Sequence, residues 1–273
     1  MSARPSVIAS ALIAAHDRDA KLLSQLASGD LIGAYALESS LTAEEQGDGE
    51  LVIRGEARSV PAAAQAAILV LPVAIGSGVE WVVLDAASLE IEPVRSVDPL
   101  RPVAHVRASG VEIGSDRLLS NLSQSAGRAI VTTLLSAEAV GIARWATDTA
   151  AAYAKIREQF GRPIGQNQGV QFPIAEAHIE IEAADLMRWR ACQEYDAGLN
   201  AGASANMAKY LAAKASWEAA NACLQTHGGF GFACEYDVER KFRETRLYQV
   251  APISTNLILS YVAEHLLELP RSF

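Results

Sequence analysis

Long alanine-rich stripes of apolar residues dominate the second half of this 273-residue chain, and they restrict its fold more than any other feature. From about residue 123 onward, apolar side chains recur at spacings of three and four, the period of a helix packed along one side. One stripe runs from Ile130 to Ile156 and a second from Val170 to Tyr195. Three further helices are predicted over about residues 203–226, 237–247 and 254–268. Long helices joined by short loops predict a C-terminal antiparallel bundle of four to five helices over residues 123–273.

The first half has a different pattern, in which short apolar runs alternate with turn residues. Four runs occur at residues 31–37, 51–53, 68–73 and 81–84, separated by Gly, Asp, Pro and Ser as in Gln46 to Gly49. Runs of this length predict an antiparallel β-sandwich or barrel-like domain over residues 30–122. Residues 6–28 have helical spacing and end at Gly29, which predicts a short helical stub over residues 1–29. The predicted fold class is therefore α+β multidomain.

Composition excludes several classes of function. The formal net charge of -9 argues against a nucleic-acid surface, which needs clustered Lys and Arg. Cys192, Cys223 and Cys234 have no C-x-x-C spacing, and the five histidines do not cluster, so neither a disulfide framework nor a metal site is expected. No signal peptide and no membrane span of about 20 unbroken apolar residues is recognised. We therefore expect a cytoplasmic protein that binds neither nucleic acid nor membrane.

The first segment whose residues could bind a ligand connects the first two long helices. It reads Arg157-Glu-Gln-Phe-Gly-Arg-Pro-Ile-Gly165. Its glycines allow close backbone approach, and its two guanidinium groups are suited to bidentate binding of phosphate. A basic loop made of ordinary turn residues explains the same composition. The segment alone leaves both interpretations open.

The second segment follows the third long helix and reads Gln225-Thr-His-Gly-Gly-Phe-Gly-Phe232. Three glycines between aromatic residues can bring backbone N–H groups against an anion or a flat ring. A helix C-cap followed by a turn has the same appearance. This segment too leaves a binding role and a structural role open.

Together, the two segments and their helices resemble the acyl-CoA dehydrogenase family. That family carries Arg-x-x-Phe-Gly at a helix end and then a Gln-rich helix start, here residues 166–168. It also carries Gln-x-x-Gly-Gly-x-Gly, Glu-Tyr-x-Val-Glu-Arg and a further Arg-containing segment, here residues 225–231, 235–240 and 243–246. The spacing between these motifs matches that of the family throughout the C-terminal half. The residues that lead into the β domain, near residues 26–37, are also similar to the family's.

The resemblance implies bound FAD. In this family the two motifs of one subunit reach across an interface to the adenosine and pyrophosphate of the flavin in its neighbour. Phosphate needs guanidinium and exposed N–H groups, and an adenine ring needs an aromatic surface such as Phe160, so the chemistry of the residues agrees. Carried over to this sequence, the resemblance implies cofactor-binding roles for Arg157, Gln159, Phe160, Asn167, Gln168, Gln225, His227, Gly228 and Gly229.

The sequence departs from the family where the catalytic base and the flavin ring are expected. The usual glutamate position falls on Pro252, and an alternative base position falls on Val131. Neither side chain can abstract a proton. Segments that would face the isoalloxazine are replaced by residues 38–40 and 59–63, and residues 1–29 correspond to a remnant of the family's N-terminal helical domain.

We therefore expect an accessory FAD-sharing subunit of a heteromeric acyl-CoA dehydrogenase that forms 2-enoyl-CoA from acyl-CoA. Its partner is expected to be a homologous full-length subunit, as an α2β2 heterotetramer of the actinobacterial type, that supplies the base and most of the acyl site. Fatty, branched and steroid side-chain thioesters all remain open as substrates.

Two alternatives remain. Glu138 lies on an apolar stripe of the first long helix, where a carboxylate is costly unless it is paired, so it is a candidate for a relocated base in an independently active flavin enzyme. A structural acid paired with an arginine explains the same position. The other alternative is a scaffold protein that kept the fold and lost the cofactor.

Overall fold

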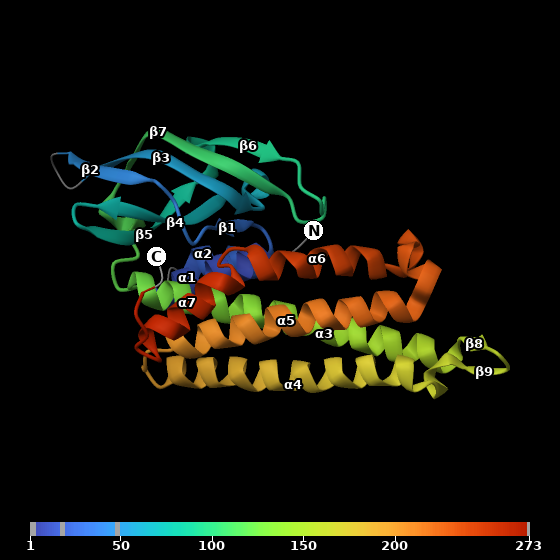
Figure 1. Cartoon of the computed structure of the whole chain (residues 1–273). Helices are drawn as coiled ribbons and strands as arrows, with labels where there is room; N and C mark the ends of the chain where they lie inside the picture. Colours follow the sequence, from blue (N-terminus) through green and yellow to red (C-terminus); the bar gives the residue numbers. More distant parts are fainter. Residues whose placement is uncertain (1–3, 17–19, 47–49, 272–273) are drawn as a thin grey trace. The chain divides into compact units, whose positions relative to one another are not determined.

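The computed structural model describes residues 4–16, 20–46 and 50–271, and the chain forms two compact units (Figure 1). The first unit comprises residues 1–131 and the second comprises residues 132–273. The predicted turn at residues 47–49 lies outside the described residues, as do residues 1–3 and 17–19 of the predicted stub. The division into three domains at residues 1–29, 30–122 and 123–273 stays a prediction.

Two helices and a curled sheet make up the first unit. Where the sequence predicted one stub helix, the structure has α1 (Arg4–His16) and α2 (Ala20–Ser28). Helix α1 packs on the first strand, since the Gly33 amide donates to Ser6 Oγ at 3.0 Å and Ala9 is fully buried. The strands are β1 (Gly33–Tyr35), β2 (Thr42–Gln46), β3 (Glu50–Pro61), β4 (Ile68–Ile75), β5 (Gly78–Asp85), β6 (Glu90–Val94) and β7 (Val103–Ile113).

The strands form a mixed sheet in the order β1-β4-β2-β3-β7-β6, with β5 also paired to β4. Most pairs are antiparallel as predicted, but β1 and β2 both run parallel to β4, which corrects the expectation of a purely antiparallel sheet. The reason is the short connection between them, because residues 36–41 carry the chain onward in one direction along the same edge of β4. Buried Ile53, Leu69, Leu71, Val82 and Leu84 form part of the core inside the curl.

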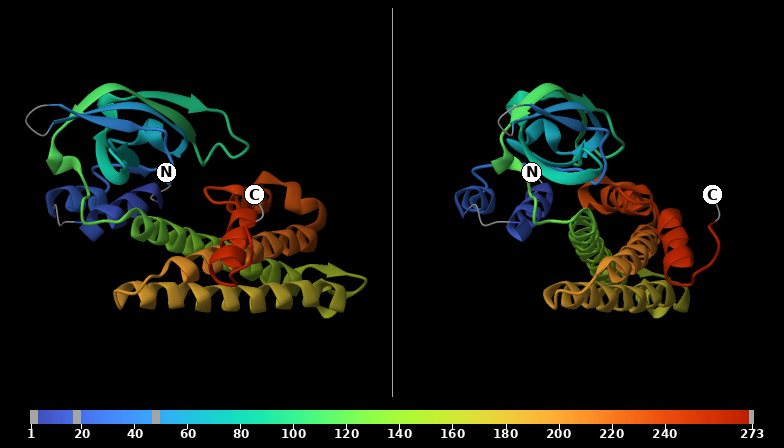
Figure 2. Two further views of the ribbon diagram at one scale, coloured as in Figure 1. Left: turned by 60° about the vertical axis from the view of Figure 1, so that its left-hand side comes forward. Right: turned by 90° about the vertical axis from the view of Figure 1, so that its left-hand side faces the viewer.

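The second unit is a helical bundle, as the apolar stripes predicted (Figure 1). Its helices are α3 (Gln124–Ile156), which begins in the first unit, α4 (Gln168–Asp196), α5 (Gly202–His227), α6 (Val238–Val250) and α7 (Thr255–His265). A short hairpin, β8 (Glu158–Gln159) and β9 (Arg162–Pro163), joins α3 to α4, and Figure 2 shows it at one end of the bundle.

Small side chains fill the middle of this bundle and let the helices approach closely. By length and composition α3 is apolar enough to cross a membrane, yet 61% of its most apolar window is buried inside the structure, as in the core helix of a bundle. The buried alanines of the bundle core include Ala139, Ala143, Ala146, Ala150, Ala177, Ala184, Ala212, Ala213, Ala215 and Ala219.

Candidate functional site

The β8–β9 hairpin presents an aromatic ring entirely to solvent. Gln159 pairs with Arg162, and the two residues between them, Phe160 and Gly161, have φ of 54° and 77°. Positive φ at both central positions is typical of the tightest hairpin turns, where glycine and asparagine are favoured. Phenylalanine is strained there, by roughly 1–2 kcal/mol. Phe160 is nevertheless 100% exposed, so no burial within this chain offsets that strain.

Hydrogen bonds hold the hairpin rigidly against the helices on either side. The Ile164 amide donates to the Arg157 carbonyl at 2.8 Å. Arg162 donates to Asn167 Oδ1 at 2.7 Å, and Asn167 Nδ2 donates to the Ile164 carbonyl at 3.0 Å. A Cβ at Gly165 would lie 2.8 Å from the Ala154 carbonyl oxygen, so this glycine allows the close approach to α3. Asn167 therefore shapes the hairpin, and its contact with a cofactor stays a prediction.

The glycine segment after α5 leaves open space beside its backbone. The 3-10 turn η6 (Gly228–Phe232) follows α5 directly, and Gly228 has φ 56° and ψ -132°, a conformation that favours glycine. A Cβ on Gly228 or Gly229 would meet no atom within 4 Å, whereas one on Gly231 would lie 2.9 Å from the Leu224 carbonyl oxygen. Packing thus requires glycine at 231 but not at 229.

Aromatic contacts bring the hairpin and the glycine segment together. His227 is buried, and its ring stacks on Tyr153 of α3 with the centroids 4.1 Å apart. His227 Nδ1 lies 2.8 Å from the Cys223 carbonyl oxygen, so one ring nitrogen is already used within α5. The Arg157 guanidinium lies over the Phe230 ring, 5.7 Å from its centroid. The two predicted segments therefore form one site, in which His227 links the helices and its direct contact with a cofactor stays a prediction.

A groove of about 530 Å³ between α4 and α5 begins beside this site. Gln225, which is exposed, lines the groove close to the glycine segment, and Gly169 lines it next to the exposed Gln168. Farther along, Lys214 lies 3.3 Å from Glu180, which raises the pKa of Lys214. The remaining lining residues are Val170, Pro173, Glu176, Ala177, Glu218, Asn221, Ala222 and Thr226.

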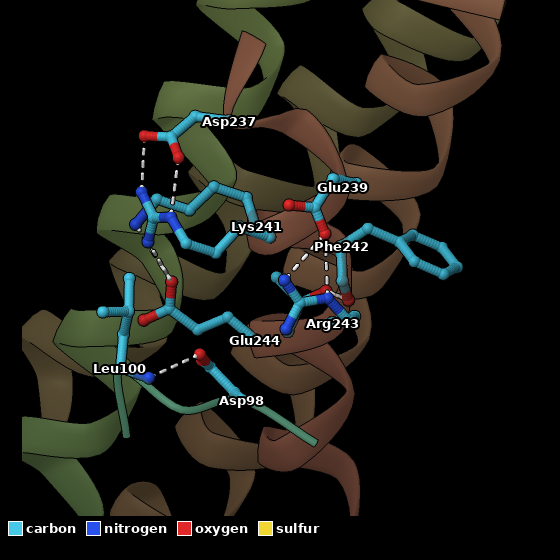
Figure 3. Close-up of polar contacts among 10 residues, drawn as sticks. Asp98, Leu100, Asp237, Glu239, Lys241, Phe242, Arg243 and Glu244 are labelled. Carbon is cyan, nitrogen blue, oxygen red and sulfur yellow. Dashed lines mark hydrogen bonds and ion pairs between the residues drawn. The ribbon is translucent and has the colours of Figure 1, made fainter. Parts of the chain in front are cut away.

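A network of ion pairs stiffens α6 and its N-cap residue Asp237, which lie within or next to the family-like residues 235–246 (Figure 3). Arg240 binds both carboxylate oxygens of Asp237, at 2.7 and 2.6 Å. Glu244 is 3% exposed, and its Oε2 lies 3.0 Å from Lys241 and 3.6 Å from Arg240. Burying this carboxylate without those cations would be strongly unfavourable. The network is a structural reason for the charged residues of this segment.

The positions expected for a catalytic base carry no suitable group. Pro252 is exposed in the connection between α6 and α7, and Val131 is fully buried in α3. Glu138 lies half-buried on α3, between turns that contribute buried Leu135 and Ile142, and it has a partner within the chain. Its alternative role as a base stays a prediction. Within the described ranges, no three His, Cys, Asp or Glu side chains are grouped so that they could hold a metal ion.

Sequence reasoning missed the residues that join the two segments. Tyr153 lies one helical turn before Arg157, and Phe230 directly follows the two exposed glycines. Tyr236 adds an edge contact to His227, with the ring centroids 5.7 Å apart. Their aromatic character was the available signal, but only the fold shows which rings meet.

Comparison with known proteins places this arrangement in a family. The family model described as "Acyl-CoA dehydrogenase, C-terminal domain" matches residues 132–267. Glutaryl-CoA dehydrogenase of Desulfococcus multivorans is 30% identical over 268 residues, which covers 89% of this chain and 69% of that protein. Acyl-CoA dehydrogenase FadE12 of Mycobacterium tuberculosis is 44% identical over 140 residues, covering 50% of this chain. That match spans only 36% of the relative's length.

Solved structures have the same fold. The glutaryl-CoA complex of a glutaryl-coenzyme A dehydrogenase superposes with a TM-score of 0.87 and 24% identity, covering 98% of this chain and 75% of the other. A chain of the ChsE4-ChsE5 complex from Mycobacterium tuberculosis gives a TM-score of 0.87 and 23% identity, covering 98% of this chain and 76% of the other. At this identity the likeness concerns the fold alone. Together with the family model and the relative that aligns over most of its length, it shows that the chain belongs to the acyl-CoA dehydrogenase family.

Proposed function

We propose that this chain is an accessory subunit that lends FAD-binding groups to a homologous full-length acyl-CoA dehydrogenase. Phe160 carries the proposal, because its ring is 100% exposed and its backbone has φ 54°. Neither feature stabilises the isolated chain. The cost of both is offset when a flat ring from outside the chain packs against the phenylalanine, since stacking a base on an aromatic side chain contributes about 1–3 kcal/mol.

The surroundings of Phe160 fit the adenosine and pyrophosphate of FAD. Arg157 offers a guanidinium group for phosphate oxygens, and its position over Phe230 holds it close to the glycine segment. Gly228 and Gly229 leave room for a ligand to approach the backbone, because a Cβ on either would occupy open space. The exposed side-chain amides of Gln159, Gln168 and Gln225 can donate to and accept from the ribose and adenine edges.

We assign cofactor binding to this chain and proton abstraction to its partner, because the expected base position here holds Pro252. FAD, when bound, accepts a hydride during oxidation of an acyl-CoA thioester to its 2-enoyl form. Pro252 cannot take the α-proton, so that step belongs to the partner, while this chain binds and orients the cofactor. The similarity in fold to a chain of the ChsE4-ChsE5 complex supports a heteromeric assembly. An α2β2 heterotetramer is the form we propose.

The test is co-expression with a full-length acyl-CoA dehydrogenase from the same genome. We expect the two chains to co-purify with flavin and acyl-CoA dehydrogenase activity, and this chain alone to hold little flavin. Phe160→Ala and Arg157→Ala in the complex are each expected to weaken flavin retention by about tenfold or more. Leu199→Ala is the control, because Leu199 is 64% exposed and follows α4 at the end away from the hairpin.

Three outcomes would overturn the proposal. Wild-type flavin retention in both Phe160→Ala and Arg157→Ala would exclude the cofactor-lending role. Flavin-dependent turnover by this chain alone would assign it as an independent enzyme, for which Glu138→Gln is the next variant. Absence of flavin both alone and with the partner would assign a scaffold role.

A further inference from the structure

Arg157 differs from the second arginine of the hairpin region in the group that holds its side chain. Arg162 donates to Asn167 Oδ1 at 2.7 Å, so an acceptor within the chain already occupies one of its donors. Arg157 is exposed, and its guanidinium carbon lies 5.7 Å from the centroid of the Phe230 ring. Within residues 4–16, 20–46 and 50–271, no acceptor binds this guanidinium group. An aromatic ring therefore holds Arg157 in the place where an acceptor holds Arg162.

A contact of this kind restrains a guanidinium group without occupying its hydrogen-bond donors. A cation within about 6 Å of a ring centroid is attracted to the negative face of the ring, which accepts no conventional hydrogen bond from it. An ion pair has a different effect, as Arg240 shows by donating to both carboxylate oxygens of Asp237 at 2.7 and 2.6 Å. Arg157 thus keeps its five N–H donors for a ligand while Phe230 limits the positions that the side chain can take.

The Phe230 ring is itself held firmly within the chain. The Ala233 amide donates to the Phe230 carbonyl at 3.0 Å and closes the turn in which the ring lies. Gly231 is buried, and a Cβ at this position would lie 2.9 Å from a carbonyl oxygen of α5, so the turn packs tightly on that helix. The Tyr236 ring packs on Phe230 with the centroids 5.5 Å apart. The aromatic support for Arg157 is therefore fixed by its own neighbours.

A side chain that is restrained before binding binds a ligand more tightly than a mobile one. Immobilising a long side chain at a binding site weakens binding by about twofold to tenfold, because its rotamer freedom is lost. The contact between Arg157 and Phe230 lies entirely within this chain, so it restrains the guanidinium group before any ligand binds. Most of this loss is then avoided when a phosphate group binds to Arg157.

We propose that Phe230 is a positioning residue, which holds the Arg157 guanidinium group ready for the pyrophosphate of FAD. This inference rests on the proposed cofactor role and adds a residue to it. In the motif Gln-x-x-Gly-Gly-x-Gly, Phe230 occupies an unspecified position, so the motif alone assigns it no role. Phe230 acts through Arg157 and does not need to touch the cofactor itself.

Nuclear magnetic resonance of the full chain without flavin tests the contact directly. The Nε–H signal of Arg157, assigned by its loss in Arg157→Lys, should be displaced by the ring current of Phe230. Phe230→Leu should return the signal to the position of a free arginine, whereas Phe230→Trp should keep it displaced. Phe232→Leu is the matched control, because Phe232 belongs to the same turn and is 78% exposed. A signal that Phe230→Leu leaves unchanged would overturn the inference.

Flavin affinity in the co-expressed complex tests the consequence of the contact. The complex with the full-length partner is stripped of flavin and titrated with FAD. Phe230→Leu should raise the dissociation constant by about twofold to tenfold, and Phe230→Trp, which restores a ring for the cation, should bring it back near the wild-type value. Phe232→Leu should leave it unchanged. An equal loss of affinity in the Phe232→Leu variant would indicate a general loss of apolar surface and would overturn the positioning role.

A double-mutant cycle shows whether Phe230 acts through Arg157. Arg157→Met removes the cation and keeps a long side chain, so adding Phe230→Leu to it should weaken flavin binding no further. Additive effects of the two substitutions would overturn the inference. Wild-type affinity in Arg157→Met would overturn the proposed cofactor role and this inference with it. Weaker binding in Arg157→Met but not in Phe230→Leu would overturn the positioning role alone, so the two failures are distinguishable.

Discussion

Replacing Lys209 by methionine is expected to lower stability by an amount that grows with pH. Lys209 lies in α5 and is 2% exposed, and its Nζ donates to the carbonyl oxygens of Tyr248 and Ile253. The Tyr248 carbonyl belongs to the last turn of α6, and the Ile253 carbonyl to the connection between α6 and α7. Burial lowers the pKa of Lys209 from 10.5 to about 8. The side chain therefore combines two favourable hydrogen bonds with the cost of holding a charge away from water.

The two effects have opposite signs at pH 7. Losing two hydrogen bonds from a charged donor costs about 1.5–3 kcal/mol each. Removing the buried charge stabilises the folded state by about 3 kcal/mol, the free energy that corresponds to a pKa of about 8 in place of 10.5. The net expectation for Lys209→Met is a loss of about 1–2 kcal/mol at pH 7.

Raising the pH separates the wild type from the variant. Between about pH 8 and pH 10.5 the folded protein has released the Lys209 proton while the unfolded chain still holds it. The unfolded state then binds more protons, so the stability of the wild type rises with pH over this window. The neutral amine still donates to both carbonyls. The difference in unfolding free energy between wild type and Lys209→Met should therefore widen by about 3 kcal/mol between pH 8 and pH 10.5.

Urea unfolding of both proteins at several pH values from 7 to 10.5 measures this difference, and other titrating groups cancel because both proteins share them. Lys214→Met is the control, since Lys214 has a 54% exposed side chain and its pKa is raised by Glu180. The small stabilising effect of Lys214 is present below its unfolded pKa of 10.5 and is lost only as the pH rises through the higher folded value, so the difference for Lys214→Met should stay constant over this pH range. A constant difference for Lys209→Met would refute the reasoning.

Other substitutions test the site and its support. Gly229→Ala should leave the unfolding free energy within about 0.5 kcal/mol but reduce flavin retention in the co-purified complex, because open space lies beside this glycine. Gly228→Ala should in addition cost about 1–3 kcal/mol in urea unfolding, because of its φ of 56° and ψ of -132°; equal stability of the two variants would contradict this assignment. Glu244→Gln should cost about 2–3 kcal/mol, since Lys241 and Arg240 lose a buried partner, and an unchanged urea midpoint would show that the network is dispensable.

The helical half of the fold was predictable because its periodicity is long. The two stripes end at Ile156 and Tyr195, each within a residue of the ends of α3 and α4. Strands β2, β6 and β7 were not predicted, because their sequences mix charged and small residues instead of forming apolar runs. Strand β6 contains Pro93, and β7 contains Gly110 at φ 99° near a shift of register. Strand β7 also pairs with β3, which lies much earlier in the chain, and local pattern carries little information on such a pairing.

The candidate site was predictable as two segments but not as one surface. Arg157 and Gly228 belong to motifs that are recognisable in the sequence, yet their proximity depends on the stacking of Tyr153 on His227 across two helices. Chemical type alone could not show that Asn167 is engaged by Arg162, or that Phe160 is wholly exposed. The geometry therefore separates residues that build the site from residues that are free to bind.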